Sequence, residues 1–545
     1  MILSLALLIA LQAPASSPLP PTDSGDPPGR VARLSVREGR VSFQPSGDTA
    51  TSSWSDAVLN YTLTSGDRLY ADQDARAELE AGDCTVRLGA GTDLTIANLT
   101  DDFLQVSMSS GTLRVTVYGL SHGDSIEVDT PNGAFLLRQP GAYRVDVSDP
   151  DRATTIRVDS GLAEVVAGEV LQSVRGGDAL ALSGSDPIRV ASMAPRPPDD
   201  FDRWSAGRDE PLAASVSAQY VGRNVPGYDD LDRAGSWETA PDYGPVWYPT
   251  RVEADWAPYR AGHWAWIDPW GWTWVDDAPW GYVPFHYGRW VYWHDRWAWA
   301  PGRVVERPCY APALVVFVSV GRGGVQGWFP LGPREPYHPW YHHGREYRER
   351  VNPDVTAVPT REVHYVNRPR VTAVPLDVFR TGEPVRRRVV RVTDVDVTRT
   401  QIISHPRVQP LPQAAGWARP AIPGRPAVQP RVVATPPPPR PRPEIHVTPW
   451  KNPAVRAPRA DVPRRQVPPP VIARNPPAPA ALPFPTRQKA MQQTDPGRPL
   501  EPVQRQNLRQ GKPAGPHRDP EEPDHAVKPA PRPKKPAPDK SPPRQ

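Results

Sequence analysis

The residues with the clearest capacity for chemistry are the aromatic side chains of a tryptophan-rich block. Of the 19 Trp residues in the chain, 15 lie between Trp237 and Trp340. An internal repeat relates residues 262–266 to residues 288–292, and each repeat places aromatic side chains two positions apart. Alternate residues of a strand point to the same face, so each repeat forms a row of rings. The residues of these rows are Trp264, Trp266, Trp272, Trp274, Trp290, Tyr292, Trp297 and Trp299.

Two interpretations of these rows are open. A small β unit has little volume for an aliphatic core, and one aromatic side chain buries about 150–250 Å². The favoured interpretation is therefore that the rings are the core of a small domain. In the alternative, the rings stay exposed and stack on a glycan, which makes the same eight residues the candidate ligand-binding set.

The other polar residues form no pattern typical of an active site. The string 338–343 has three His at metal-ligand spacing, but Pro336 and Pro339 oppose the helix that this spacing needs. Asp276 and Asp277 are adjacent, so they point to opposite sides instead of flanking one bond. No nucleophile elbow, zinc-protease motif, phosphate-binding loop or dinucleotide fingerprint is present. The sequence predicts a protein that is not an enzyme, with no catalytic residue, metal or cofactor.

Short strands must position the aromatic rows. Each repeat predicts a β-hairpin, and a third hairpin is expected from residues 314–318 through a Gly-rich turn at 321–324 to Trp328. Residues 237–345 are thus predicted to form a Trp-rich β-hairpin domain. Upstream, residues 30–190 alternate polar and apolar side chains and carry a turn signal about every 8–12 residues. This region is predicted to be an all-β sandwich, barrel or solenoid, and the fold class of the chain is mainly β.

Short motifs in the first region resemble a known domain. They are the strings 57–61, 65–69, 75–79, 104–117, 128–131 and 141–145. Residues 30–190 resemble the FecR-type periplasmic domain through these motifs. In the signalling members of that family, the domain follows a transmembrane helix and a cytoplasmic segment that contacts a sigma factor. This chain shows neither, so the resemblance implies only the β domain.

The Trp-rich block has a resemblance of its own. Its matching strings are 256–259, 271–274, 279–282, 286–290, 299–302 and 327–331. They are similar to a Trp-, Tyr- and Pro-rich family of unknown function in bacterial envelope proteins. That family commonly follows a FecR-type domain, and the resemblance implies no known activity.

The N-terminus has the features of a secretory signal peptide. The apolar run from Ile2 to Leu11 is too short to span a bilayer, which needs ~20 residues, and a small-residue site follows at 13–15. Residues 1–15 are predicted to be the signal, and the mature protein is expected in the periplasm or cell envelope without spanning a membrane. The two cysteines, Cys84 and Cys309, lie in different predicted domains and are expected to be buried and unpaired.

Charge and proline content divide the rest of the chain. Residues 1–344 hold 27 Arg against 43 Asp and Glu, whereas all seven Lys lie at or beyond Lys451. The last 141 residues contain 39 of the 74 Pro, each of which removes a backbone donor. Residues 401–545 are therefore predicted to be a disordered basic tail. Residues 191–236 are predicted to be a linker, and residues 346–400 a partly ordered extension.

The location and the charges favour a binding role. The expected partners are peptidoglycan, polysaccharide or an anionic membrane surface, or another envelope protein, and nucleic acid is not expected for an acidic exported body. The sequence thus predicts an exported, non-enzymatic cell-envelope protein that acts as a structural or binding scaffold. The alternative is a FecR-like signalling component that acts through a membrane partner.

Overall fold

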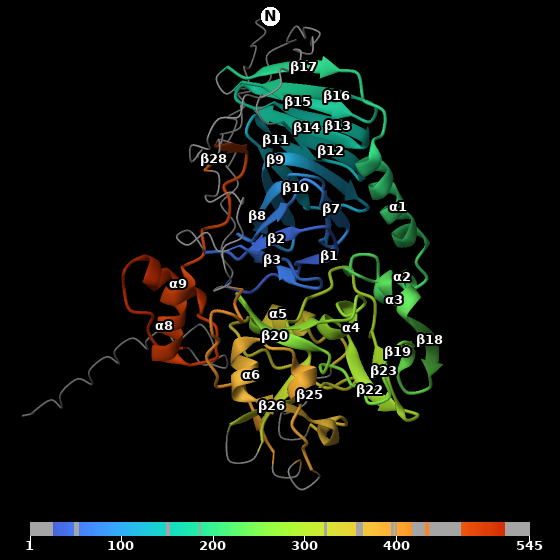
Figure 1. Ribbon diagram of the computed structural model, residues 1–545, viewed down its shortest axis with the longest axis vertical. Helices are drawn as coiled ribbons and strands as arrows, with labels where there is room; N and C mark the ends of the chain where they lie inside the picture. The colour runs from blue at the N-terminus through green and yellow to red at the C-terminus, as the bar shows by residue number, and fades with distance from the viewer. Residues whose placement is uncertain are drawn as a thin grey trace, which may run out of the picture.

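The computed structural model describes residues 25–47, 54–148, 153–184, 187–320, 324–355, 363–393, 397, 400–416, 431–434 and 470–517. A β-sandwich lies at one end of the molecule, and the Trp-rich domain lies at the other (Figure 1). The predicted mainly β fold class is confirmed. The predicted signal peptide at 1–15 lies outside the described residues.

The N-terminal β-sandwich has two sheets that share the long strand β9 (Phe103–Val117). The first sheet has the order β4 (Thr62–Leu63), β1 (Ala32–Glu38), β6 (Arg76–Glu80), β7 (Cys84–Leu88), β9, β12 (Gly141–Val147), β13 (Thr154–Ser160), β16 (Ala179–Ser183), β17 (Arg189–Met193). The second has the order β3 (Ser55–Asp56), β2 (Val41–Gln44), β5 (Arg68–Ala71), β8 (Asp93–Leu99), β9, β10 (Ser125–Thr130), β11 (Gly133–Leu137), β14 (Leu162–Ala167), β15 (Val170–Arg175). Of these neighbours, only β9 and β10 run parallel.

Period-two alternation explains the sandwich. Leu113, Val115 and Val117 of β9 are buried in the core between the sheets. Arg114 lies between them in sequence, so it points to the opposite face of its sheet. There it aligns with Arg144 of β12.

A helix lies where the sequence predicts a linker. Helix α1 (Asp200–Ala214) begins at the N-cap Asp199, whose carboxylate accepts a hydrogen bond from the backbone of Asp202. The Asp202 side chain in return accepts from the N-cap backbone, which completes a capping box. The helix lies along the side of the sandwich (Figure 1). Two short helices, α2 (Ala218–Val221) and α3 (Asp230–Ala234), follow.

The Trp-rich domain contains the three predicted hairpins. They are β20 (Gly262–Ile267) with β21 (Gly271–Asp276), β22 (Arg289–Trp293) with β23 (Arg296–Ala300), and β24 (Val315–Ser319) with β25 (Val325–Pro330). A further hairpin, β18 (Gly235–Ala240) with β19 (Gly244–Pro249), extends the second of these hairpins, because β19 pairs with β23. The helix α4 (Val283–His286) separates the first hairpin from the second along the chain.

The predicted extension belongs to this domain. Strands β26 (Thr372–Pro375) and β27 (Gln401–Ile403) flank the third hairpin on its two sides. Two helical segments precede β26, α5 (Arg345–Arg350) and η2 (Arg368–Arg370), and two follow it, α6 (Leu376–Thr381) and η3 (Val385–Arg388).

The C-terminal region differs from the expected disordered tail over residues 470–517, which we call the strap. The strap contains β29 (Val471–Ala473), α8 (Phe484–Thr494) and α9 (Pro502–Arg509), and β29 pairs with β28 (Val432–Ala434). It packs on both domains, because β29 meets β10 whereas Phe484 and Met491 join the Trp-rich core. The remaining tail residues, 417–430, 435–469 and 518–545, lie outside the described part.

Direct polar contacts join the two domains. Asn60 of the sandwich donates through Nδ2 to the carbonyl of Ala278 at 2.7 Å, and the Thr62 hydroxyl lies 2.8 Å from that of Tyr310. All four residues lie at the junction of the sandwich with the Trp-rich domain. Across the described residues, no helix is long and apolar enough to cross a membrane.

Candidate functional site

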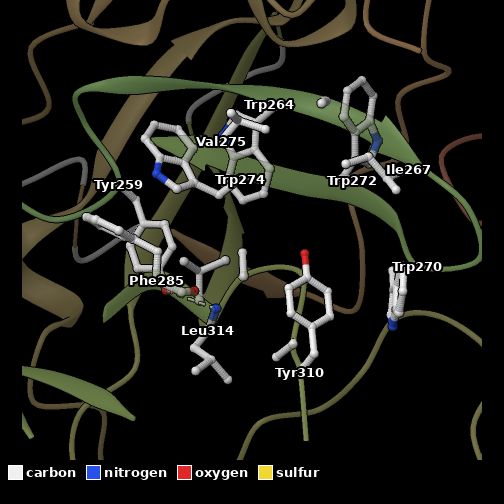
Figure 2. Close-up of a cluster of buried hydrophobic side chains, with 14 of the residues drawn as sticks. Tyr259, Trp264, Ile267, Trp270, Trp272, Trp274, Val275, Phe285, Tyr310 and Leu314 are labelled. Carbon is white, nitrogen blue, oxygen red and sulfur yellow. Dashed lines mark hydrogen bonds between the residues drawn. The ribbon is translucent and has the colours of Figure 1, made fainter. Parts of the chain in front are cut away.

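The predicted aromatic rows lie inside the Trp-rich domain. Seven of the eight residues are buried, with exposed fractions of 7% for Trp297 and 3% or less for Trp264, Trp266, Trp272, Trp274, Trp290 and Trp299. Figure 2 shows Trp274 packed with Tyr259 and Phe285, and Trp272 lying beside Ile267. The eighth residue, Tyr292, is half-buried.

Cross-strand pairing explains why these rings fill the core. Trp264 faces Trp274 and Trp266 faces Trp272 across the first hairpin, with edge-on ring centroids 5.5 and 5.4 Å apart. Edge-to-face pairs of this kind add about 0.5–1.5 kcal/mol to the burial of each ring.

These contacts correct the glycan-stacking interpretation of the rows. A buried ring has no face open to a ligand from solvent. Tyr292, the one half-buried member, has the guanidinium of Arg370 only 3.5 Å from its ring centroid. The eight residues are therefore packing residues, and of them Trp299 also contributes to the lining of a cleft described below.

The other residues considered for chemistry have structural surroundings. Asp276 is buried and accepts hydrogen bonds from the Trp274 indole and from the backbone of Ala278, each at 3.0 Å. Cys84 and Cys309 are unpaired, and burial raises the pKa of each thiol to about 12. In the described part of the chain, no three His, Cys, Asp or Glu side chains gather at metal-binding distance.

A cleft of about 440 Å³ opens at the edge of the Trp-rich domain. Its walls come from α2, the turn between β18 and β19, the end of α4, the start of β22, the end of β23, the loop after β25 and the segment after α5. Tyr220, Tyr243, Tyr287 and Trp299 provide an aromatic lining. This volume lies within the range of about 300–1,000 Å³ that accommodates small ligands.

Arg289, the first residue of β22, lines this cleft and is only 9% exposed. Its Nε donates to the carbonyl of Glu335 at 3.3 Å, and its Nη1 donates to the carbonyl of Gly288 at 2.9 Å. Its Nη2 donates to Oδ1 of Asn352 at 3.0 Å. A guanidinium has five N–H donors, so these three bonds leave two donors unused within the described structure.

The absence of a carboxylate sets Arg289 apart. Eight Arg residues of the described chain are buried, and seven of them form ion pairs with Asp or Glu: Arg33, Arg68, Arg87, Arg114, Arg144, Arg157 and Arg487. Arg289 forms no ion pair with any described residue, and burial lowers its pKa to about 10. A buried cation whose partners are all neutral is a costly arrangement.

Neighbouring groups fix the position of this guanidinium. Asn352 accepts from the backbone of Tyr337 at 2.7 Å through the same Oδ1, and its Nδ2 donates to the carbonyls of Tyr337 and Arg348. The Glu335 carboxylate is held by the backbone amides of Gly332 and Val366, each at 2.6 Å, so it forms no ion pair with Arg289, although its charge acts to raise the pKa of Arg289.

The rim of the cleft is also cationic. Arg303, Arg334 and Arg350 line it with Arg289, against the two carboxylates Asp242 and Asp354. Four positive and two negative side chains line the cleft, but Arg350 pairs with Asp101 and Arg303 pairs with Asp354, so Arg289 and Arg334 are the two lining arginines without an ion pair among the described residues. Two such cations at one cleft suit an anionic ligand.

One deep residue of the cleft is a neutral polar group. His286 is fully buried, its Nδ1 lies 2.8 Å from the carbonyl of Ala311, and its Nε2 has no partner among the described residues. Burial lowers the pKa of His286 to about 3, so the ring is neutral at physiological pH.

Part of the cleft lies in residues that match a family model. Residues 228–335 match a family of unknown function, DUF6600. The match includes Arg289, Arg303 and Arg334 but ends before Asn352. Comparison with curated proteins gives no match.

Two solved structures, at 2.50 and 1.65 Å resolution, of a candidate anti-sigma factor from Parabacteroides distasonis ATCC 8503 are also similar in part. Each has 18% identity and a TM-score of 0.21, and the alignment covers 23% of this chain and 60% of that chain. The resemblance of residues 30–190 to FecR-type domains stays a prediction.

Proposed function

We propose that this chain is an exported, non-enzymatic protein of the cell envelope that acts as a binding scaffold. In this proposal the DUF6600 domain contacts a polar envelope polymer, a glycan or an anionic polymer, through the cleft around Arg289. The cleft is the observation that carries the proposal, since its volume, its aromatic walls and its two arginines without an ion pair among the described residues suit such a ligand.

Two further observations support a scaffold over an enzyme. Both thiols are buried and have a pKa of about 12, so neither supplies a thiolate at neutral pH. Asp276 is buried, and its carboxylate accepts hydrogen bonds from Trp274 and Ala278. The direct contacts between sandwich and Trp-rich domain suit a body that holds a binding face in a fixed position.

Two experiments test this proposal. The first fractionates cells that express the full chain and sequences the N-terminus of the recovered protein. We expect it in the periplasmic or envelope fraction, starting after residue 15 or close to it. A cytoplasmic protein that begins at Met1 contradicts the export.

The second experiment mixes the purified mature protein with isolated peptidoglycan and with anionic polysaccharide, and sediments the polymer. We expect the protein in the pellet at low salt and less of it at high salt, because screening weakens attraction between charges. A protein that stays in the supernatant with every polymer contradicts the binding role. The alternative, a FecR-like signalling role through a membrane partner, stays a prediction.

A further inference from the structure

We infer that Arg289 is the anchor for a carboxylate or phosphate group of an acidic saccharide that enters the cleft. The inference deepens the proposed function and rests on it for the source of the ligand. The chemistry that it names, one anion on one buried guanidinium, comes from the contacts of Arg289 itself.

The first step of the argument is the charge balance of buried arginines. Every other buried Arg in the described structure has a carboxylate partner, as for Arg68, whose Nη2 lies 2.5 Å from Asp93. An ion pair is therefore the rule for buried arginines in the described structure. The exception is Arg289, which lines the cleft of about 440 Å³. An anion from outside would complete the pattern.

The second step is geometry. Asn352 and two backbone carbonyls hold the guanidinium through one N–H of each nitrogen. The two unused donors are one N–H on Nη1 and one N–H on Nη2. A carboxylate or phosphate has two oxygens that can accept from these two terminal nitrogens. A guanidinium fixed before binding also loses little side-chain entropy when the ligand arrives.

The third step concerns the rest of the ligand. The cleft has room beyond a single anionic group, and its walls combine Tyr220, Tyr243 and Tyr287 with the charged rim. Aromatic rings with hydroxyl tips suit a sugar ring, which has apolar faces and polar edges. An acidic monosaccharide unit therefore fits both the anchor and the walls.

The test is calorimetric titration of the full mature chain with three probes: D-glucuronate, D-glucose 1-phosphate and neutral D-glucose. The first two separate a carboxylate source from a phosphate source. We expect one or both to bind with a Kd below about 10 mM and glucose to bind at least about tenfold more weakly. Equal binding of glucose, or no binding of either acidic sugar, overturns the inference.

Variants locate the site. Arg289→Met removes the fork and is expected to weaken the acidic probe at least about tenfold, and Arg289→Lys, which keeps the charge without the fork, by an intermediate factor. Because Arg289→Met removes three hydrogen bonds of the folded state, circular dichroism and the thermal midpoint are measured alongside. Arg334→Glu changes an exposed rim residue and is expected to weaken binding about threefold or more. The matched control is Arg196→Glu, an exposed Arg of the sandwich, which is expected to leave binding unchanged.

The outcomes separate this inference from the proposed function. If a folded Arg289→Met or Arg334→Glu protein binds the acidic probe as well as the wild type does, the anchor is wrong. If the wild type binds acidic sugars in the cleft but no envelope polymer sediments it, the anchor stands and the proposed function fails. If polymer binding survives unchanged in Arg289→Met, the scaffold stands and the anchor is overturned.

Discussion

At the scale of single residues, Asp202 shows how a buried carboxylate organises the sandwich surface. Arg114, Arg144 and Arg157, from three adjacent strands, each lie within 3.2 Å of its oxygens. Burial alone would raise the pKa of Asp202, but hydrogen bonds from Arg157 and from the Asp199 backbone, together with the arginine charges, lower it to about 2. The side chain thus stays ionised and fastens α1 to the sheet.

We expect Asp202→Asn to lower the free energy of unfolding at pH 7 by about 3–5 kcal/mol, because it leaves buried arginines short of charge. The folded pKa lies below the ordinary value of 3.8, so the stabilisation is complete above about pH 4 and is lost as the pH falls toward 2. Urea unfolding should show the gap between wild type and variant narrowing over that window.

The matched control on the same helix is Asp200→Asn, whose side chain is 84% exposed. It should change the free energy of unfolding by less than about 0.5 kcal/mol. A gap between wild type and Asp202→Asn that stays constant from pH 5 to pH 2.5 would contradict the role given to this carboxylate.

At the scale of elements, the strap forms a strand and two helices, although its proline-rich composition predicts disorder. Its backbone amides at Arg474 and Asn475 donate to the Glu127 carboxylate at 2.7 and 3.1 Å. Farther along, α8 inserts Phe484 into the Trp-rich core, and Arg487 pairs with Asp268 at the turn of the first hairpin. The strap therefore ties the sandwich to the Trp-rich domain.

We expect Phe484→Ala to destabilise the protein by about 3–5 kcal/mol, the usual cost of removing a fully buried Phe. The strap should also become more accessible, so limited proteolysis should cut within 470–517 sooner than in the wild type. Val503→Ala, on the exposed face of α9, is the control and should change neither stability nor cleavage. Identical cleavage of wild type and Phe484→Ala would show that the strap does not depend on this contact.

The elements differ in how far the sequence predicts them. The hairpins follow from local pattern, since aromatic residues alternate and turn residues separate the strands. Helix α1 carries only a weak signal, the acidic capping pair Asp199 and Asp202, because charged residues surround it and Pro211 interrupts it. The strap carries a weak signal at Glu501 and Gln504, the capping box of α9, but its contacts with the two domains join residues more than 70 positions apart in sequence.

The candidate site was unpredictable for the same reason. Burial of the Trp rows follows from the size of the domain, and the sequence favours it. Arg289, in contrast, is one Arg in an aromatic strand. The neighbouring residues in the sequence do not indicate that it will be buried without a carboxylate partner. Asn352, which positions it, lies 63 residues further along the chain.

At the scale of the whole molecule, buried carboxyls lie close to where the two domains meet. Arg33 of the sandwich donates to the carbonyl of Pro279 in the Trp-rich domain at 2.6 Å and pairs with Asp230 at 2.7 Å. Glu80 lies farther from Arg33, at 3.4 Å, with Glu78, Asp229 and Asp230 as acidic neighbours. Burial is the main cause that raises the pKa of Glu80 to about 8, against the attraction of Arg33.

The raised carboxyl pKa values predict that the protein becomes less stable as the pH rises from about 5 to 8, and below about pH 6.5 His286, with its lowered pKa, acts in the opposite direction and offsets part of the fall. Burial likewise raises the pKa of Asp67 to about 7 and that of Asp229 to about 6. Between its ordinary pKa and its raised pKa, each group holds a proton in the folded state that the unfolded chain has released, so increasing pH favours unfolding. Each contributes a slope of up to about 1.4 kcal/mol per pH unit.

Urea unfolding of the full chain at pH 5, 6, 7 and 8 should show the decline in the free energy of unfolding. Glu80→Gln cannot titrate and should flatten it, whereas Glu238→Gln, whose side chain is 42% exposed, should not. Stability that is constant over this range, or a Glu80→Gln curve parallel to the wild type, would mean that Glu80 is already ionised in the fold and that Arg33 holds it as a second carboxylate partner.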